Sequence, residues 1–126
     1  MNKWLESTIL AYIVHFSATF RPVVWEVGSR DGHDGVELAQ RIYAGKNFWE
    51  DAKVVCIEPN PPQAKIIRNN YPQAEVFEVA ASDRGGKQRF MVYDGDEGAV
   101  GSSSLDLGWK QDLPGHTIVI CCNLIS

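Results

Sequence analysis

Short runs of β-branched residues alternate with helix-like segments, and this alternation constrains the fold of the chain more than any other feature. Residues 23–27, 54–57 and 76–80 form apolar runs of strand length. The segments between them, residues 33–45 and 61–70, carry apolar residues at helical spacing. Strand–helix–strand–helix–strand order is typical of parallel sheets with right-handed crossovers. We therefore expect an α/β fold with a mostly parallel sheet and flanking helices.

The chain beyond residue 82 follows a different pattern. Residues 89–93 come too soon after the preceding turn for a helical crossover, which predicts an antiparallel strand. Residues 94–104 are rich in glycine, serine and acids and predict a loop, and the apolar residues 117–122 predict a last strand. With 126 residues in total, the chain is expected to hold at most one domain.

The start of the chain predicts a helix of its own. Residues 3–20 read as an amphipathic helix, so we divide the chain into an N-terminal unit, residues 1–22, packed on a domain that spans residues 23–126. The apolar run at residues 9–16 is too short to span a bilayer, which takes about 20 residues. The residues after it match a signal-peptide cleavage site poorly.

Charge and cysteine content narrow the class of protein. The formal net charge of −4 removes the usual electrostatic argument for a nucleic-acid or membrane partner. The three cysteines give no disulfide framework and no metal-ligand spacing. Cys56 is expected in the core, whereas Cys121 and Cys122 are expected on opposite faces of a strand. A cytoplasmic location is the prediction.

The first apolar run ends in a glycine turn that begins with an acid. Gly28 and Gly32 allow a sharp turn and close approach of the backbone to a ligand. Their G-x-x-x-G spacing differs from the G-x-G-x-x-G of dinucleotide sites. Glu26 just before the first glycine suits a cationic group such as an ammonium better than a pyrophosphate. The alternative is a plain strand-to-helix turn with a solvated acid.

Polar or small residues also end the next two runs. Glu58 could accept hydrogen bonds from both hydroxyls of a ribose, although a charge at a strand end needs no ligand to explain it. Ala81 and its neighbours leave room for a flat base, and Ser82 or Asp83 could bond the amino group of that base.

Three motifs in this order resemble the FkbM family of S-adenosylmethionine-dependent methyltransferases, which have a class I, Rossmann-like fold. The motifs are Trp25-Glu26-Val27-Gly28-Ser29-Arg30-Asp31-Gly32, Cys56-Ile57-Glu58-Pro59-Asn60-Pro61 and Val79-Ala80-Ala81-Ser82-Asp83 with Gly85 or Gly86, followed by the serine-rich Gly101-Ser102-Ser103-Ser104-Leu105. The resemblance covers roughly residues 23–120.

The resemblance implies a cofactor, S-adenosylmethionine, and a set of residues that hold it. Glu26, Gly28 and Gly32 would line its methionine part, and Ser29 of the same turn is counted with the cofactor-binding residues. Glu58 would hold the ribose. The adenine would be flanked by Ala81 and Ser82. In this turn the family usually has Asp at the position of Glu26 and Asn at that of Arg30.

The resemblance further implies O-methylation of a hydroxyl on a sugar or other small metabolite. The family continues into a strand with an acidic D-x-E-G motif, which this sequence does not reach, so we expect the N-terminal part of a methyltransferase domain. Two alternatives remain: a non-catalytic remnant or partner-completed fragment, and a nicotinamide-dependent enzyme, which the missing G-x-G-x-x-G disfavours.

Three further expectations concern surfaces and side chains outside these motifs. An incomplete parallel sheet exposes an edge, so self-association is expected. The cluster Asp31, His33 and Asp34 is explained by solvated acids better than by a metal ion. His33 follows the glycine turn, but no catalytic base is assigned.

Overall fold

A computed structural model describes residues 3–17, 21–43, 48–93, 104–105 and 115–124 of the chain. In chain order the elements are α1 (Lys3–Ser17), β1 (Val23–Val27), α2 (His33–Ile42), α3 (Phe48–Asp51), β2 (Lys53–Ile57), α4 (Pro61–Asn70), β3 (Glu75–Phe77), β4 (Ala80–Ser82), β5 (Gly86–Tyr93), β6 (Ser104–Leu105) and β7 (Gly115–Leu124). The strands form two sheets, ordered β1-β2-β3 and β4-β7-β5-β6. The predicted α/β fold is confirmed.

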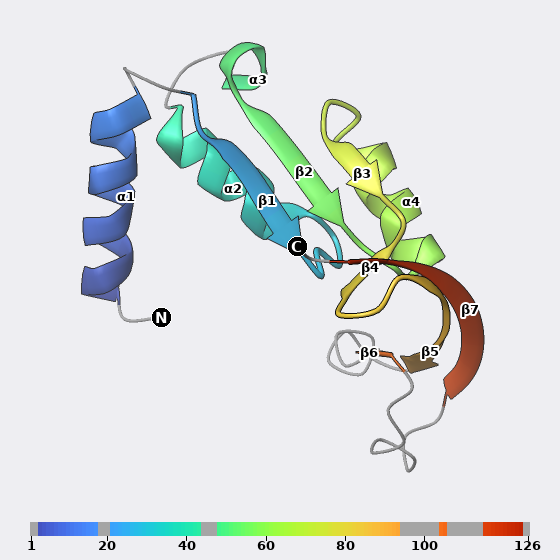
Figure 1. Ribbon diagram of the computed structural model, residues 1–126. Helices are drawn as coiled ribbons and strands as arrows, with labels where there is room; N and C mark the ends of the chain where they lie inside the picture. Colours follow the sequence, from blue (N-terminus) through green and yellow to red (C-terminus); the bar gives the residue numbers. More distant parts are fainter. Residues whose placement is uncertain (1–2, 18–20, 44–47, 94–103, 106–114, 125–126) are drawn as a thin grey trace.

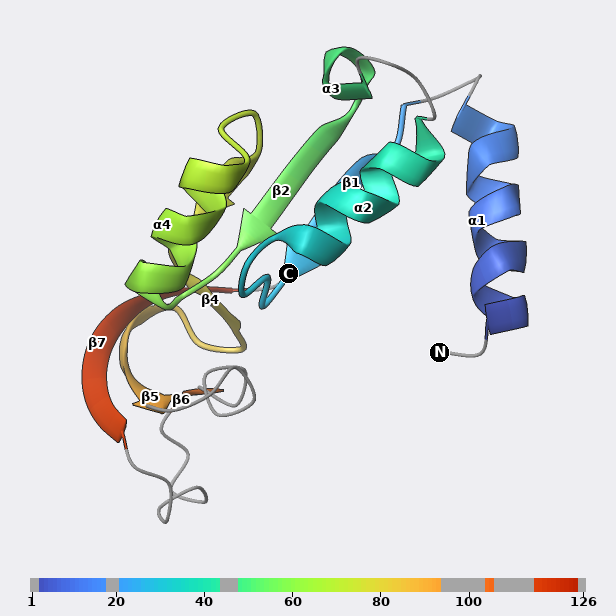
Figure 2. The same ribbon diagram turned by 180° about the vertical axis from the view of Figure 1, so that it is seen from behind.

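The first sheet is parallel throughout and carries its helices on one face. Glu26 of β1 is in register with Cys56 of β2, which is in register with Val76 of β3. Figure 1 shows these strands in front of α2 and α4, and Figure 2, the view from behind, shows both helices in front of the strands. Helices on one face follow from two successive right-handed crossovers in the same direction across the sheet. The arrangement is that of an incomplete Rossmann-like fold.

The main hydrophobic core lies between this sheet and its helices. Its buried members come from β1, α2, β2 and α4: Val24, Val36, Ala39, Ile42, Val54, Cys56 and Ile67. The spacing of Val36, Ala39 and Ile42 puts them on one side of α2, which is why the helical periodicity of this segment was readable in the sequence. Cys56 is fully buried, as predicted.

The third apolar run differs from the prediction, which had one strand at residues 76–80. The structure divides it into β3 and β4, with a break at Glu78 and Val79. β3 pairs with β2, whereas β4 belongs to the second sheet and pairs in parallel with β7. Continuous apolar character predicts strand conformation but carries no information on which sheet each part joins.

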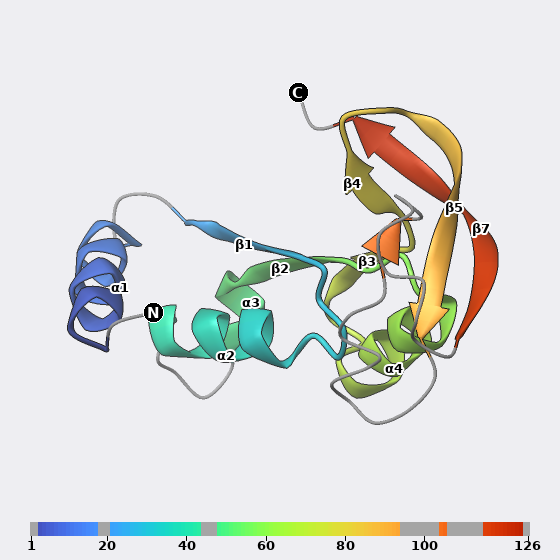
Figure 3. The same cartoon turned by 90° about the horizontal axis from the view of Figure 1, so that it is seen from below.

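The second sheet has its own small core and lies beyond the carboxyl ends of β1 and β2 (Figures 1 and 3). β5 runs antiparallel to β7, so the predicted antiparallel strand is confirmed and is longer than expected. Cys121 is exposed and Cys122 buried, as alternation along a strand requires. Residues 94–103 of the predicted loop lie outside the described residues, and Ser104 belongs to β6.

The N-terminal helix α1 lies next to α2, on the β1 side of the sheet (Figures 1 and 2). Leu10 and Ile13 pack against the main core, while Trp4 and Tyr12 are 73% and 68% exposed. The predicted end of this helix, residues 18–20, lies outside the described residues. In the part of the chain that is described, no helix is both long and apolar enough to cross a membrane.

Candidate functional site

The turn between β1 and α2 is shaped by three residues with positive φ. Gly28 has φ 75°, Arg30 has φ 53° and Gly32 has φ 77°. The main-chain N–H groups of Gly28 and Ser29 both donate to the carbonyl oxygen of Ile57, at 2.8 and 3.2 Å, and so tie the turn to the end of β2. This left-handed backbone is accessible to glycine without a steric penalty, which accounts for the spacing of the two glycines.

The two glycines meet different surroundings. A Cβ atom added at Gly32 would lie 3.0 Å from Cγ2 of Ile67, because the turn packs closely on α4. A Cβ atom added at Gly28 would have no heavy atom within 4 Å among the described residues. Gly28 therefore borders open space, where the backbone can be approached from outside.

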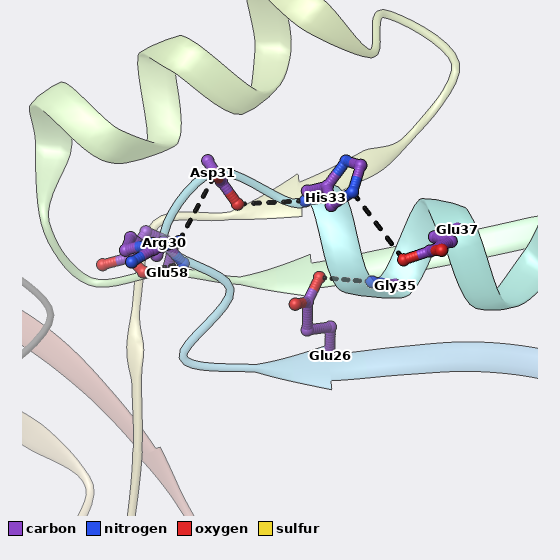
Figure 4. Close-up of polar contacts among 7 residues, drawn as sticks. All are labelled: Glu26, Arg30, Asp31, His33, Gly35, Glu37 and Glu58. Carbon is purple, nitrogen blue, oxygen red and sulfur yellow. Dashed lines mark hydrogen bonds and ion pairs between the residues drawn. The ribbon is translucent and has the colours of Figure 1, made fainter. Parts of the chain in front are cut away.

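Glu58, the residue directly after β2, is 6% exposed and contacts the glycine turn. Its Oε2 accepts a hydrogen bond from the main-chain N–H of Arg30 at 2.6 Å, and its Oε1 accepts one from the N–H of Asn60 at 2.9 Å. Figure 4 shows Glu58 beside Arg30 at the tip of the turn. The acid that the sequence predicts to bind a ribose thus fixes the backbone of the glycine turn, and its contact with a ribose stays a prediction.

Glu26 rises from β1 toward the first turn of α2 (Figure 4). Its Oε2 accepts a hydrogen bond from the main-chain N–H of Gly35 at 3.1 Å. An added Cβ atom at Gly35 would lie 2.7 Å from this Oε2, so the glycine leaves the space that the carboxylate fills. A carboxylate here is favoured by the positive end of the helix dipole.

A second acid, Asp31, accepts a hydrogen bond at the start of α2. Oδ1 of Asp31 accepts a hydrogen bond from the main-chain N–H of His33 at 3.1 Å, and its Oδ2 lies 3.6 Å from the Arg30 guanidinium. Nε2 of His33 lies 3.7 Å from Oε2 of Glu37, on the exposed surface of the helix. Asp31 and Glu26 therefore place two carboxylates at the N-terminal end of one helix.

Burial raises the pKa of both candidate acids above the ordinary range. For Glu26, desolvation is the largest cause, the Gly35 N–H opposes it, and the carboxylates of Asp34 and Asp31 raise the pKa further. For Glu58, desolvation again raises the pKa, and the N–H groups of Asn60 and Arg30 lower it. Acids with shifted pKa values are common where proteins bind ligands.

The structure brings most of the predicted residues together. Glu26, Gly28, Ser29, Gly32 and Glu58 all lie at the carboxyl ends of β1 and β2. Ser29 is buried, and its hydroxyl donates to the carbonyl oxygen of Glu26 at 2.7 Å, so this side chain stabilises the turn. The acids do not lie on opposite sides of the molecule.

Ala81 and Ser82 are placed differently. Both belong to β4 of the second sheet, where Ala81 is in register with Asn123 of β7. The Ser82 hydroxyl donates to Oδ1 of Asp83 at 3.3 Å and accepts from the N–H of Arg84 at 3.2 Å. Their contact with an adenine stays a prediction.

Two residues of this region have no role in the expectations drawn from the sequence. A glycine inside a helix costs about 1 kcal/mol relative to alanine, so Gly35 within α2 is a signal in the sequence of a packing reason. Asn60 is 4% exposed, and its Oδ1 has no hydrogen-bond partner among the described residues. An Asn directly before two prolines looks like a helix cap, but its side chain makes no capping bond.

Comparison with known proteins relates part of the chain to a curated enzyme. No protein-family profile and no solved structure matches the chain. A stretch of 78 residues is 33% identical to the 2-O-methyltransferase NoeI of Sinorhizobium fredii (strain NBRC 101917 / NGR234). The match covers 60% of this chain but 29% of the relative, so the chain spans well under two thirds of that protein. The similarity relates this chain distantly to a methyltransferase.

Proposed function

We propose that the glycine turn and its two acids bind S-adenosylmethionine, and that the chain supplies the cofactor-binding part of an O-methyltransferase. The observation that carries the proposal is the Glu26 carboxylate, which occupies the N-terminal end of α2 through the Gly35 N–H. When bound, this cofactor supplies a methyl group on a positively charged sulfur. The acceptor in this proposal is a hydroxyl oxygen of a sugar or small metabolite.

The charge at the helix terminus favours this cofactor over a dinucleotide. Dinucleotide sites bind a pyrophosphate on the free N–H groups of a helix N-terminus. Here the N–H groups of His33 and Gly35 already donate to carboxylates of Asp31 and Glu26. A phosphate would lose those donors and meet two negative charges, whereas the ammonium and sulfonium of S-adenosylmethionine would be attracted by them.

The surrounding residues fit the other parts of the cofactor. Glu58 uses each carboxylate oxygen for one main-chain hydrogen bond, and each oxygen can accept a second one, from a ribose hydroxyl. The open side of Gly28 allows a ligand to approach the backbone. Oδ1 of Asn60, buried and without a described partner, is an acceptor that a hydroxyl or a water could satisfy. Holding donor and acceptor in register is the main contribution such a site makes to methyl transfer.

The relative supports the reaction class. Its name describes methyl transfer to an oxygen, and it shares a region of 78 residues with this chain. We extend the proposal to a small-molecule or glycan acceptor, a cytoplasmic location and no nucleic-acid or membrane partner on the sequence arguments above.

Calorimetric titration tests the proposal. The wild-type protein is titrated with S-adenosylmethionine, S-adenosylhomocysteine and NAD, and the titrations are repeated on Glu58→Gln and Glu58→Ala. We expect the first two ligands to bind and NAD not to bind. Loss of hydrogen bonds to a charged acceptor should weaken binding by about tenfold or more in both variants.

The matched control is Glu78→Gln, which removes an exposed acid paired with Arg68 on the surface and should leave binding unchanged. Binding of NAD without S-adenosylmethionine would contradict the proposal and favour a nicotinamide enzyme. Binding of S-adenosylmethionine without methyl transfer to any alcohol would point to a non-catalytic relative that kept the site.

A further inference from the structure

Gly35 and Glu26 form a matched pair across the gap between α2 and β1. The Oε2 of Glu26 lies 3.1 Å from the N–H of Gly35. The position where a Cβ atom of residue 35 would stand is 2.7 Å from Oε2 and 3.1 Å from Cβ of Glu26. Any side chain at position 35 therefore competes with the Glu26 carboxylate for the same space.

We propose that Gly35 is a positioning residue, which sets where the Glu26 carboxylate lies and thereby how tightly the site holds the cationic part of its ligand. The proposal rests on the proposed function and adds to it a residue outside the glycine turn. A glutamate at position 26 reaches about one methylene further than an aspartate would, and the missing Cβ at position 35 accommodates that extra length. Figure 4 shows the second carboxylate oxygen of Glu26 turned away from Gly35.

The effect of a side chain at position 35 should fall on the ligand more than on the fold. The nearest atom to the added Cβ is the far end of a flexible side chain, which can rotate away. An alanine inside a helix is also favoured over glycine by about 1 kcal/mol, which offsets the tighter contact with Cβ of Glu26. The carboxylate would lose its Gly35 N–H bond and leave the position in which it was held.

The experiment is a double-mutant cycle between Gly35→Ala and Glu26→Asp, with binding of S-adenosylhomocysteine measured by calorimetry and stability by urea unfolding. Gly35→Ala should weaken binding about tenfold or more while the urea midpoint changes little. Glu26→Asp shortens the acid and should also weaken binding. In the double variant the aspartate leaves room for the alanine, so its loss of affinity should be smaller than the product of the two single losses.

The control within the same helix is Gln40→Ala, an exposed position that should change neither binding nor stability. Wild-type affinity in Gly35→Ala would overturn the proposal. A double variant whose loss of affinity equals the product of the losses in the two single variants would also overturn it. Failure of the wild-type protein to bind either adenosyl ligand would refute the proposed function instead.

The positioning of Glu26 by Gly35 can also be tested without a ligand, whether or not the wild-type protein binds an adenosyl compound. The Gly35 N–H is one of the groups that lower the pKa of Glu26. A displaced carboxylate changes both this hydrogen bond and its burial, so titration of the Glu26 carboxyl by NMR should give a pKa in Gly35→Ala that differs from the wild-type pKa. An unchanged pKa would mean that the carboxylate had not moved, which would overturn the positioning role.

Discussion

Glu26 and Glu58 are acids whose oxygen atoms bind main-chain N–H groups, yet burial raises the pKa of both. At Glu26 the neighbouring acids Asp34 and Asp31 act in the same direction as burial. The site thus holds negative charge in a place where that charge is unfavourable without a positive partner. A bound ammonium or sulfonium would remove part of this cost, which links the electrostatics of each residue to the ligand that we propose.

The raised pKa of Glu26 makes a prediction for stability against pH. The folded protein holds the Glu26 proton more tightly than the unfolded chain does, and this difference contributes to the free energy of unfolding. The contribution is complete below the ordinary pKa of 4.5 and is lost as pH rises through the pKa of Glu26 in the folded protein. In Glu26→Gln this loss is absent, and the amide oxygen can still accept from Gly35. The free energy of unfolding of the variant relative to wild type should therefore increase from pH 4 to pH 7.

Urea unfolding at several pH values measures this difference. Glu78→Gln, at an exposed ion pair, serves as the control and should shift the curve by less than about 1 kcal/mol at any pH. A difference between Glu26→Gln and wild type that stays flat, or shrinks as pH rises, would count against the assignment.

At the scale of the elements, the turn between β1 and α2 combines required glycines with one strained residue. Gly32 needs both its positive φ and its missing side chain, because Ile67 lies so close. Arg30 adopts φ 53° without being a glycine. The hydrogen bond from its main-chain N–H to Glu58 holds it in that conformation, so the acid that follows β2 stabilises an unfavourable backbone in the turn between β1 and α2.

Arg30→Gly should relieve this strain. A left-handed conformation costs a residue with a side chain about 1–2 kcal/mol, and part of that gain is offset by the greater freedom of glycine in the unfolded chain. The lost ion pair with Asp31 is exposed and contributes little. We expect the free energy of unfolding to rise by about 0.5–1 kcal/mol.

Arg30→Ala is the matched variant, because it removes the same guanidinium but keeps the Cβ atom. It should show no such gain in chemical denaturation. Equal stability of the glycine and alanine variants would indicate that the turn backbone is not strained at this position.

At the scale of the whole molecule, the first sheet ends at β1, the outermost strand among those described. Val23, Trp25 and Val27 of this strand are 43%, 60% and 61% exposed, on the face away from α2 and α4. Edge strands in native proteins are usually blunted by charge or proline, and these side chains offer neither. Parallel sheets, moreover, are normally covered on both faces.

Self-association through this strand is the expected consequence. Light scattering after size exclusion, over a range of protein concentrations, should show the apparent mass of the wild type rising with concentration. Trp25→Lys puts a charge at the centre of the exposed face of β1 and should return the protein toward the monomer. Val119→Lys is the control, since Val119 is 67% exposed but lies on β7, between β4 and β5.

A wild-type protein that remains a monomer at every concentration would contradict this prediction. Equal effects of the two lysine substitutions would show that general surface charge, and not the β1 edge, controls association.

Local pattern in the sequence was enough to predict β1, α2, β2 and α4, since helical and strand periodicity depends on near neighbours. It also predicted that Glu26 and Glu58 share one edge of the sheet, because the carboxyl ends of adjacent parallel strands meet there. Only the tertiary structure decided three other features: the pairing of β4 with the second sheet, the hydrogen bond from the Arg30 N–H to Glu58, and the close packing of Gly35 on Glu26. Each depends on which distant segments come into contact and on how closely their atoms approach, and no local pattern encodes either.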